Sequence, residues 1–547
     1  MISPGHGSGA DEPLQRAGRR RPRGTAPRSA PVPRLPAISA ACLALVTALA
    51  FLVPSVRAAE RPNVVIVYAD DLGYGDVRCY NPDRGRIPTP HIDRLAAEGM
   101  RFTDGHSSSG VCSPSRYTLL TGRYHWRTRL KAGIVGLWER PLIDPDRLTI
   151  AGLARQRGYR TAAIGKWHLG WDWPLAEGDK QLLGQAAKGR PRPGPEDVTE
   201  RQRAAWQRIF SQPIAGGPTT RGFDTYFGTD VPNWPPYCFI ADDRTVGIPT
   251  TLLPPSEFQH HRASTQGPAL ADWRLEAVLP ALRDRAVAFI EEAAKGAPPF
   301  LLYLPLTSPH TPLAVNDPWR GKSGLDNACA DLVMETDAVV GDVLAALERA
   351  GVGENTLVVF TSDNGFAPSV GAAALEARGH FPSGPLRGYK SDAWEGGHRV
   401  AFIVRYPGVA RPGSVCDALV HQADLMATVA DLLDAELPAD AGEDSVSLLP
   451  LLEGGREPVR RHAVSCSIRG VPSIRDGHWK LILGTGSGGW SKGGEDGSDV
   501  QLYDLATDVG ERRNLATDQP ERVAAMQAAY EALVAAGRSR PTTPPTE

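Results

Sequence analysis

The chain has 547 residues, a length that predicts one large and one smaller domain. Of these residues 41% are hydrophobic and 22% are charged, as in an ordinary soluble globular protein. Its 60 Lys and Arg nearly balance its 62 Asp and Glu, which excludes a global positive field that would attract nucleic acid. No nucleic-acid partner is therefore expected, and any anionic ligand must be held by a local cluster of cations.

The first 59 residues differ in character from the rest of the chain. Residues 1–34 are rich in Arg, Pro and Gly and predict a disordered region. An uncharged, mostly apolar stretch from Leu35 to Val56 follows and ends in small residues, an order typical of a secretory signal. We therefore expect an exported protein, periplasmic or extracellular. The stretch is also long enough for an uncleaved membrane anchor, which stays the alternative.

From Arg61 onward, strand-like and helix-like segments alternate. Runs of β-branched and aromatic residues predict buried strands at 64–68, 161–164, 300–306, 357–361 and 401–405. Apolar residues at helical spacing predict helices at 91–98, 149–157, 283–294 and 326–350. This alternation predicts an α/β fold in which helices sandwich a large, mostly parallel sheet.

The pattern changes at two places farther along. Residues 171–221 are polar and rich in Pro and Gly, which indicates an insertion with one helix near 196–210. After about Leu452, two regions at 473–483 and 501–505 predict antiparallel strands around a Gly-rich solvated loop at 484–497, followed by a helix at 520–536. The predicted organisation is a signal or anchor region (1–59), a large domain (60–452) and a smaller C-terminal α+β domain (453–547) that ends in a loose tail.

Acidic residues directly follow two of the predicted strands, as Asp70-Asp71 and as Asp363-Asn364. Ligands of open α/β sheets bind beyond the carboxyl ends of the strands. Three carboxylates and one amide there would suit a hard cation such as Ca²⁺. Zinc is a poorer choice, because no cluster of His and Cys accompanies them. The alternative is that both pairs are ordinary turn residues.

Four short segments of the chain resemble sequence motifs of a known enzyme family. Gly110–Arg123 has the sequence GVCSPSRYTLLTGR and Gly158–His168 has GYRTAAIGKWH, while Ser308–Pro312 and Lys390–Gly397 follow later. Together and in this order they resemble the type I sulfatases, the formylglycine-dependent, arylsulfatase-like branch of the alkaline phosphatase superfamily. The resemblance runs from about residue 63 to residue 407.

The resemblance implies both a fold and a chemistry. The large domain would have the alkaline-phosphatase-like sheet, and a formylglycine-generating enzyme would oxidise Cys112 to 3-oxoalanine (formylglycine). The hydrate of this aldehyde would attack the sulfur of a sulfate monoester, releasing inorganic sulfate and the free alcohol, with His310 as general acid. The implied catalytic residues are Cys112, Arg116, Lys166, His168, His310 and Lys390. The implied Ca²⁺ ligands are Asp70, Asp71, Asp363, Asn364 and the modified Cys112.

Several aromatic residues in loops stand beside carboxylates, a combination that suits sugar rings. The candidate substrate-binding residues are Trp138, Trp171, Asp172, Trp173 and Trp234. The alternative is that these aromatic side chains only fix long loops to the scaffold. By analogy, the expected substrate is a sulfated carbohydrate rather than a small sulfate ester.

Two other functions stay open at this point. The first is a formylglycine-dependent phosphodiesterase or phosphonate monoester hydrolase on the same scaffold. The second is a protein that binds sulfated glycans without catalysis. The complete set of charged and nucleophilic residues argues against the second, because binding alone has no use for all of them.

Overall fold

A computed structural model describes residues 61–183, 198–254, 257, 264–493 and 498–541. The predicted disordered region and apolar stretch, residues 1–59, lie outside the described residues, and so does part of the Gly-rich loop. Within the described ranges, no helix has the length and apolar character needed to cross a membrane. The chain from residue 61 onward forms one compact unit, and a domain boundary after residue 452 stays a prediction.

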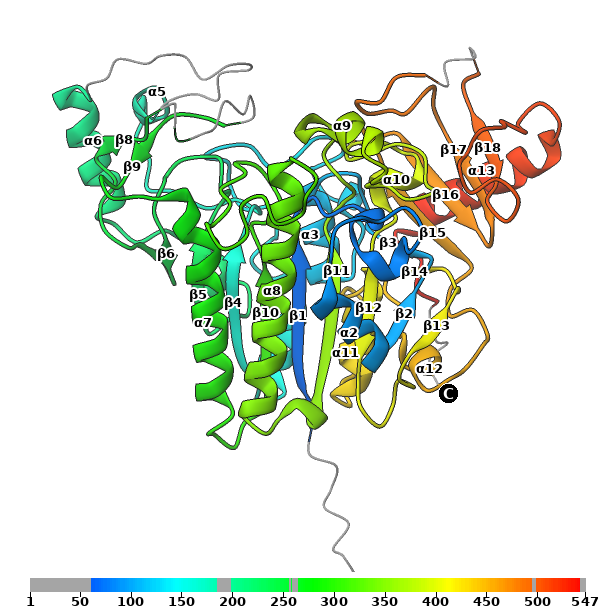
Figure 1. The fold of residues 1–547 in the computed structure, drawn as a ribbon, viewed down its shortest axis with the longest axis horizontal. Helices are drawn as coiled ribbons and strands as arrows, with labels where there is room; N and C mark the ends of the chain where they lie inside the picture. Colours follow the sequence, from blue (N-terminus) through cyan, green and yellow to red (C-terminus); the bar gives the residue numbers. More distant parts are fainter. Residues whose placement is uncertain (1–60, 184–197, 255–256, 258–263, 494–497, 542–547) are drawn as a thin grey trace, which may run out of the picture. The chain divides into compact units, whose positions relative to one another are not determined.

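A ten-stranded mixed sheet lies at the centre of this unit (Figure 1). In spatial order its strands are β13 (Ser414–Cys416), β2 (Met100–Phe102), β12 (Phe402–Arg405), β11 (Thr356–Ser362), β1 (Asn63–Ala69), β10 (Phe300–Pro305), β4 (Arg160–Lys166), β5 (Thr225–Thr229), β6 (Ile240–Ala241) and β7 (Arg244–Thr245). The five strands from β11 to β5 are parallel to one another. The predicted strand at 401–405 exists as β12 but pairs antiparallel with β11. The sheet therefore has a parallel centre flanked by antiparallel pairings.

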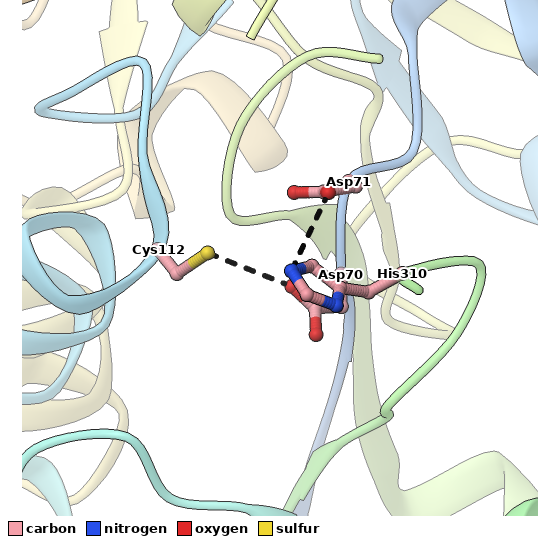
Figure 2. A group of neighbouring side chains, drawn as sticks. All are labelled: Asp70, Asp71, Cys112 and His310. Carbon is pink, nitrogen blue, oxygen red and sulfur yellow. Dashed lines mark hydrogen bonds and ion pairs between the residues drawn. The ribbon is translucent and has the colours of Figure 1, made fainter. Parts of the chain in front are cut away.

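The register of the central strands brings the acidic residues together. Ala69, the last residue of β1, pairs with Ser362, the last residue of β11. The residues that follow, Asp70 and Asp363, therefore leave the sheet side by side at its carboxyl edge. Asp70 and Asp71 lie at the tip of β1 in Figure 2. The parallel centre of the sheet thus creates the edge on which the candidate site is built.

Helices cover both faces of the sheet. On one face lie α2 (Pro90–Glu98), α7 (Val278–Ala293) and α8 (Ala328–Arg349), and on the other α3 (Cys112–Thr121), α4 (Ile150–Gln156) and α11 (Asp424–Leu432). Side chains of β1 alternate between them: Val65 and Val67 belong to the first core, Val64 and Ile66 to the second. The predicted sandwich is confirmed.

The predicted helices agree closely with those observed, with one exception. Helices α2, α4 and α8 begin and end within one or two residues of the predicted 91–98, 149–157 and 326–350, and the side chain of Thr149 caps α4 by accepting from the N–H of Gly152. Helix α7 begins at Val278, five residues before the predicted start. The sequence signal was weaker there, because a proline lies in its first turn.

The shorter elements lie in the connections and at the C-terminal end. The helices are α5 (Asp179–Leu182), α6 (Glu200–Phe210), α9 (Ala372–Ala377), α10 (Glu395–His398), α12 (Leu449–Leu452) and α13 (Pro520–Ala536). Two small sheets pair β14 (Val420–His421) with β3 (Gly105–His106) and β8 (Thr251–Leu252) with β9 (Pro268–Ala269). A four-stranded antiparallel sheet contains β15 (His462–Cys466), β16 (Pro472–Asp476), β17 (Trp479–Ile482) and β18 (Gln501–Asp504). Helix α13 packs on this sheet, so the predicted C-terminal strands and helix are confirmed.

Buried ion pairs attach the C-terminal sheet to the rest of the unit. The ammonium of Lys480 on β17 lies 2.9 Å from a carboxylate oxygen of Glu395 and 2.8 Å from one of Glu511. On β16, Arg475 lies 2.8 Å from Asp104. Breaking such a pair would leave a buried charge uncompensated, at a cost of about 3–5 kcal/mol. The ion pairs therefore fix the position of the C-terminal sheet against α10, which begins five residues after Lys390.

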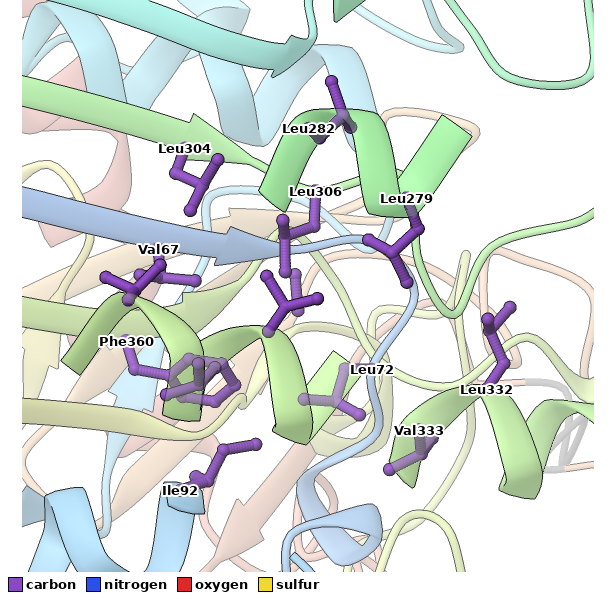
Figure 3. Packing of buried hydrophobic residues seen from close by; sticks show 14 of the residues in the cluster. Val67, Leu72, Ile92, Leu279, Leu282, Leu304, Leu306, Leu332, Val333 and Phe360 are labelled. Atoms are coloured by element: carbon purple, nitrogen blue, oxygen red, sulfur yellow. The ribbon is translucent and has the colours of Figure 1, made fainter. Parts of the chain in front are cut away.

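The core beneath α7 and α8 gives a direct test of the packing (Figure 3). Leu304 on β10 is fully buried in this core. We expect Leu304→Ala to lower the free energy of unfolding by about 2–5 kcal/mol, because the truncated side chain leaves a cavity that its neighbours cannot fill. Chemical denaturation would measure the loss.

Val246→Ala serves as the matched control for Leu304→Ala, since Val246 is 44% exposed. Its effect should stay within about 0.5 kcal/mol. Equal losses for the two variants would contradict the packing described here.

Candidate active site

Three carboxylates and an amide meet at the carboxyl ends of β1 and β11. Asp70, Asp71 and Asp363 are all buried, and the backbone N–H of Asp71 donates to Asp363 Oδ1 over 3.1 Å. Asn364 Nδ2 donates to Asp71 Oδ1 over 2.8 Å. The side-chain oxygen of Asn364 is buried and has no hydrogen-bond donor among the described residues. The predicted oxygen set is therefore brought together.

Each of these carboxylates is paired with a buried cation from another element. Lys166, the last residue of β4, places its ammonium 2.7 Å from Asp70 Oδ2. The ammonium of Lys390 lies 2.6 Å from Asp71 Oδ2. Arg116 on α3 forms two hydrogen bonds to Asp363 Oδ2, of 3.1 Å and 2.7 Å. The three predicted cations thus surround the predicted oxygen ligands.

Cys112 is the first residue of α3 and points into this charged cluster (Figure 2). Its sulfur lies 3.8 Å from Asp70 Oδ1 and 3.7 Å from the ammonium of Lys390. The chain before it runs close to another backbone: a Cβ at Gly110 would lie 2.9 Å from the carbonyl oxygen of Asp392. Glycine there lets the segment with Cys112 approach the segment with Lys390.

Two histidines border the cluster. His310 Nε2 lies 3.7 Å from Asp71 Oδ2, and Nδ1 lies 2.6 Å from the carbonyl oxygen of Thr311. His168 adopts a positive φ of 53°, and its Nε2 lies 3.1 Å from the carbonyl oxygen of Val135. His168 Nδ1 is buried and has no hydrogen-bond partner in the described ranges. All six predicted catalytic side chains therefore lie in or beside one cluster.

The electrostatics of the cluster follow from burial and charge. Burial raises the pKa of the Cys112 thiol to about 12, although Lys166 and Lys390 act in the opposite direction. Burial also opposes ionisation of Asp70, but Lys166, followed by His310 and Arg116, outweighs it and holds the pKa at about 2. Burial lowers the pKa of His310 against the pull of Asp70 and Asp71. At neutral pH the site thus contains an ionised Asp70, a protonated thiol and a neutral His310.

The donor atoms fit a hard divalent cation. Carboxylate and amide oxygens are the ligands that Ca²⁺ prefers, and Asn364 Oδ1 is a buried acceptor that lacks a donor among the described residues. Asp70, Asp71, Cys112 and His310 offer atoms that all lie within 4.8 Å of one another. A cation bound by these carboxylates would give the side-chain oxygen of Asn364 a partner that no described residue supplies.

The five candidate substrate-binding residues do not share one environment. Trp138, Trp171 and Trp173 are largely buried, and the rings of Trp138 and Trp173 lie 5.1 Å apart. Asp172, which stands between Trp171 and Trp173 in the sequence, is exposed. The half-buried ring of Trp234 lies 5.4 Å from that of His168, so this residue borders the cluster directly. Contact of these five residues with a substrate stays a prediction.

The Gly-rich loop is a contributor that the sequence analysis missed. In its described part, the N–H of Trp490 donates to Ser391 Oγ over 2.8 Å and to Asp392 Oδ1 over 3.0 Å. A Cβ at Gly489 would lie 2.4 Å from the carbonyl oxygen of Ser391. The prediction of a solvated loop is therefore wrong for residues 486–489, which are buried, although residues 485, 490, 492 and 493 are exposed. Glycines between two strands were the available signal, since they often mark a close backbone approach.

Comparisons with known proteins come from both sequence and structure. Residues 62–435 match the family model described as Sulfatase. An N-acetylgalactosamine-6-O-sulfatase of Bacteroides thetaiotaomicron is 31% identical over 85% of this chain and 91% of its own length. Arylsulfatase A of Homo sapiens is 32% identical over 84% of each chain. A solved sulfatase structure, from work on glycosaminoglycan metabolism by Bacteroides thetaiotaomicron, has a TM-score of 0.72 and 29% identity, and the match covers 87% of this chain and 99% of that one.

Asp230 was not among the predicted site residues, and it gives a test of the site's electrostatics. Its Oδ1 accepts the N–H of His168 over 3.1 Å. Burial raises its pKa from the ordinary 3.8 to about 6. Because the folded-state pKa is the higher one, the stability present below about pH 4 is lost as the pH rises through about 6.

We expect Asp230→Asn to be more stable than the parent protein at about pH 8, by about 2–3 kcal/mol, because the amide keeps an acceptor oxygen without the buried charge. The difference should shrink toward zero below about pH 4. Urea unfolding over this pH range measures it, with the exposed Asp284→Asn as control. A gain that did not depend on pH would disprove this explanation.

Proposed function

The chain belongs to the sulfatase family, and from this membership we propose that it removes sulfate from a sulfated carbohydrate with a formylglycine at position 112 and a bound Ca²⁺. As a sulfatase it hydrolyses a sulfate ester to inorganic sulfate and an alcohol. The observation that carries the detailed proposal is the convergence of Cys112, Lys166 and Lys390 on buried carboxylates. The carbohydrate is supported by the N-acetylgalactosamine-6-O-sulfatase relative and by the structural neighbour from glycosaminoglycan metabolism.

The residues at the strand ends would hold the two groups that the family implies. Asp70, Asp71, Asp363 and Asn364 would bind the Ca²⁺, and a formylglycine-generating enzyme would convert Cys112. When present, the cation supplies positive charge for the sulfate oxygens, and the aldehyde hydrate supplies an oxygen nucleophile. The N-terminal sequence supports an exported protein.

The chain's own cations would neutralise the sulfate. A sulfate ester is an anion, and attack on its sulfur requires positive charge in fixed positions. Lys166 and Lys390 lie on two sides of the cluster, against Asp70 and Asp71, and both are buried. Because both ammonium groups are buried away from solvent, their charges act more strongly than they would in water. Arg116 would hold Asp363 in place through its two hydrogen bonds.

The two histidines would move protons at defined atoms. His310 Nδ1 donates to the carbonyl of Thr311, so Nε2 is the atom that would take up a proton and then pass it to the departing alcohol. His310 also stands at the opening of the site, since its side chain is 10% exposed. In His168, Nε2 is occupied by the carbonyl of Val135, so Nδ1 is the atom available to accept a proton.

A second candidate function uses the same scaffold. A formylglycine-dependent phosphodiesterase or phosphonate monoester hydrolase needs the same nucleophile and a similar charge arrangement. The sulfate ester is favoured because the family and the named relatives are sulfatases. A protein that only binds sulfated glycans would not require a buried Cys112 between Asp70 and Lys390.

The first test combines mass spectrometry with activity. We expect the peptide that contains Cys112 to be lighter by about 18 Da after maturation, as for oxidation of the thiol side chain to an aldehyde. Such protein should release sulfate from a sulfated monosaccharide, lose the activity on chelation and regain it with Ca²⁺. Cys112→Ala is the control. Modified protein that cleaved phosphate diesters and no sulfate ester would support the second candidate function instead.

The second test concerns the role of His310. His310→Ala should lower kcat by about 10²–10⁴-fold on a sugar sulfate, because the sugar alkoxide leaves poorly without a proton. On nitrophenyl sulfate the loss should be much smaller, because nitrophenolate leaves without protonation. His478→Ala, at an exposed histidine, should leave both rates unchanged. Equal losses on the two substrates would show that His310 is not the general acid.

A further inference from the structure

An arginine-lined pocket lies apart from the site described above. It encloses about 540 Å³ beside the start of α4. Its arginines are Arg123, Arg127, Arg129, Arg140, Arg147 and Arg221. Only two carboxylates, Asp144 and Asp172, share the lining, and none of the proposed catalytic residues or Ca²⁺ ligands is part of it. The pocket therefore needs an explanation of its own.

Three of the six arginines form close ion pairs with carboxylates outside the lining. Arg127 lies 2.9 Å from Asp444, to which it donates two hydrogen bonds. Arg123 and Arg147 both contact Glu443, over 3.0 Å and 2.8 Å. These pairs explain the positions of three guanidinium groups, and the three arginines form part of the lining.

Arg221 is different, because it is largely buried and forms no ion pair with any described residue. It is 7% exposed, its Nε donates to the carbonyl of Ile143, and its Nη1 donates to Thr220. Nη2 has no acceptor, and no carboxylate lies within 4 Å of the guanidinium, among the described residues. Burial lowers its pKa, more than the distant Asp172 and Asp144 raise it. Nη2 is the guanidinium nitrogen that is left to donate to an anion in the pocket.

Arg140 and Arg129 add charge at the opening. Arg140 is exposed and forms no ion pair in the part of the chain that the structure describes. Arg129 donates to the backbone carbonyl of Arg140 over 2.7 Å, and its nearest carboxylate oxygen, on Glu139, is 3.8 Å away. Arg140 is therefore free to turn toward an anion, whereas Arg129 would exchange its hydrogen bonds to the carbonyls of Arg140 and Pro141 for bonds to the anion.

A second cavity of about 480 Å³ adjoins the pocket and shares Arg129, Arg140 and Asp172 with it. Its lining also includes the tryptophans 138, 171 and 173 and Lys180. The two cavities together thus place an exposed carboxylate and the small accessible parts of three largely buried indole rings beside a group of arginines. Aromatic surfaces and carboxylates suit sugar rings, while planar guanidinium groups bind tetrahedral oxyanions with two hydrogen bonds.

We propose that this arginine-lined pocket binds a sulfate group of a sulfated oligosaccharide, one that is not the sulfate being hydrolysed. The sugar beside that group lies along the tryptophan-lined cavity. The inference rests on the proposed carbohydrate substrate, and it makes the preferred substrate an oligosaccharide with more than one sulfate group. The anion in the pocket is bound and released without any covalent change.

The test compares a monosulfated with a polysulfated substrate in Arg140→Ser and in the double variant Arg129→Ser/Arg140→Ser. For a polysulfated tetrasaccharide we expect KM to rise by about tenfold, because charge-assisted hydrogen bonds are lost. Both kcat and KM should stay unchanged for a monosulfated monosaccharide. Neither residue is buried, so folding should not be affected, and Arg274→Ser at an exposed arginine elsewhere is the matched control.

Direct binding separates this inference from the proposed function. Calorimetric titration of Cys112→Ala protein with the same tetrasaccharide should show weaker binding in the arginine variants, whether or not any sulfate is released. If neither substrate were hydrolysed, the proposed function would fail, and the titration would still report on the pocket. Unchanged binding and unchanged KM in both variants would overturn the inference. Binding of inorganic sulfate alone, with the same dependence on the arginines and no gain from the sugar, would also overturn it.

Discussion

Compensation of buried charge is the constraint on which this molecule depends. Asp70, Asp71 and Asp363 are removed from water at the edge of the parallel sheet, which would cost several kcal/mol for each unpaired ion. The compensating cations come from the end of β4, from α3 and from the loop that contains Lys390. Distant parts of the chain must therefore meet at one point before any of these charges is satisfied.

The same principle recurs where the C-terminal sheet joins the main sheet. His106, Glu395 and His398 offer possible metal ligands within 4.8 Å of one another. Lys480 and Arg475 already approach Glu395, so protein cations supply the charge that a metal would otherwise bring. We interpret this second cluster as a structural clamp. It secures the chain five residues after Lys390, which keeps the candidate site coupled to the C-terminal sheet.

Much of this could be predicted from the sequence, because local signals agreed with the fold. The apolar runs of β1, β10 and β11 and the spacing in α8 were sufficient to predict the sandwich, and the motif around Cys112 predicted the family, which the family match confirms. The direction of β12 was not predictable, since a short apolar run is compatible with either orientation. The contacts of Trp490 with Ser391 and Asp392, and the burial of Arg221, join residues that are far apart in the sequence. No local pattern encodes such contacts.

The position of the loop before β18 has a consequence for how the protein is made. Ser487 and Trp490 form hydrogen bonds to the segment after Lys390. During synthesis they leave the ribosome about a hundred residues after Lys390. A chain released before that point would contain every charged residue of the site but would lack the contacts that fix Asp392 and Ala393. The segment after Lys390 therefore takes its final position only once residues 487–490 have been translated.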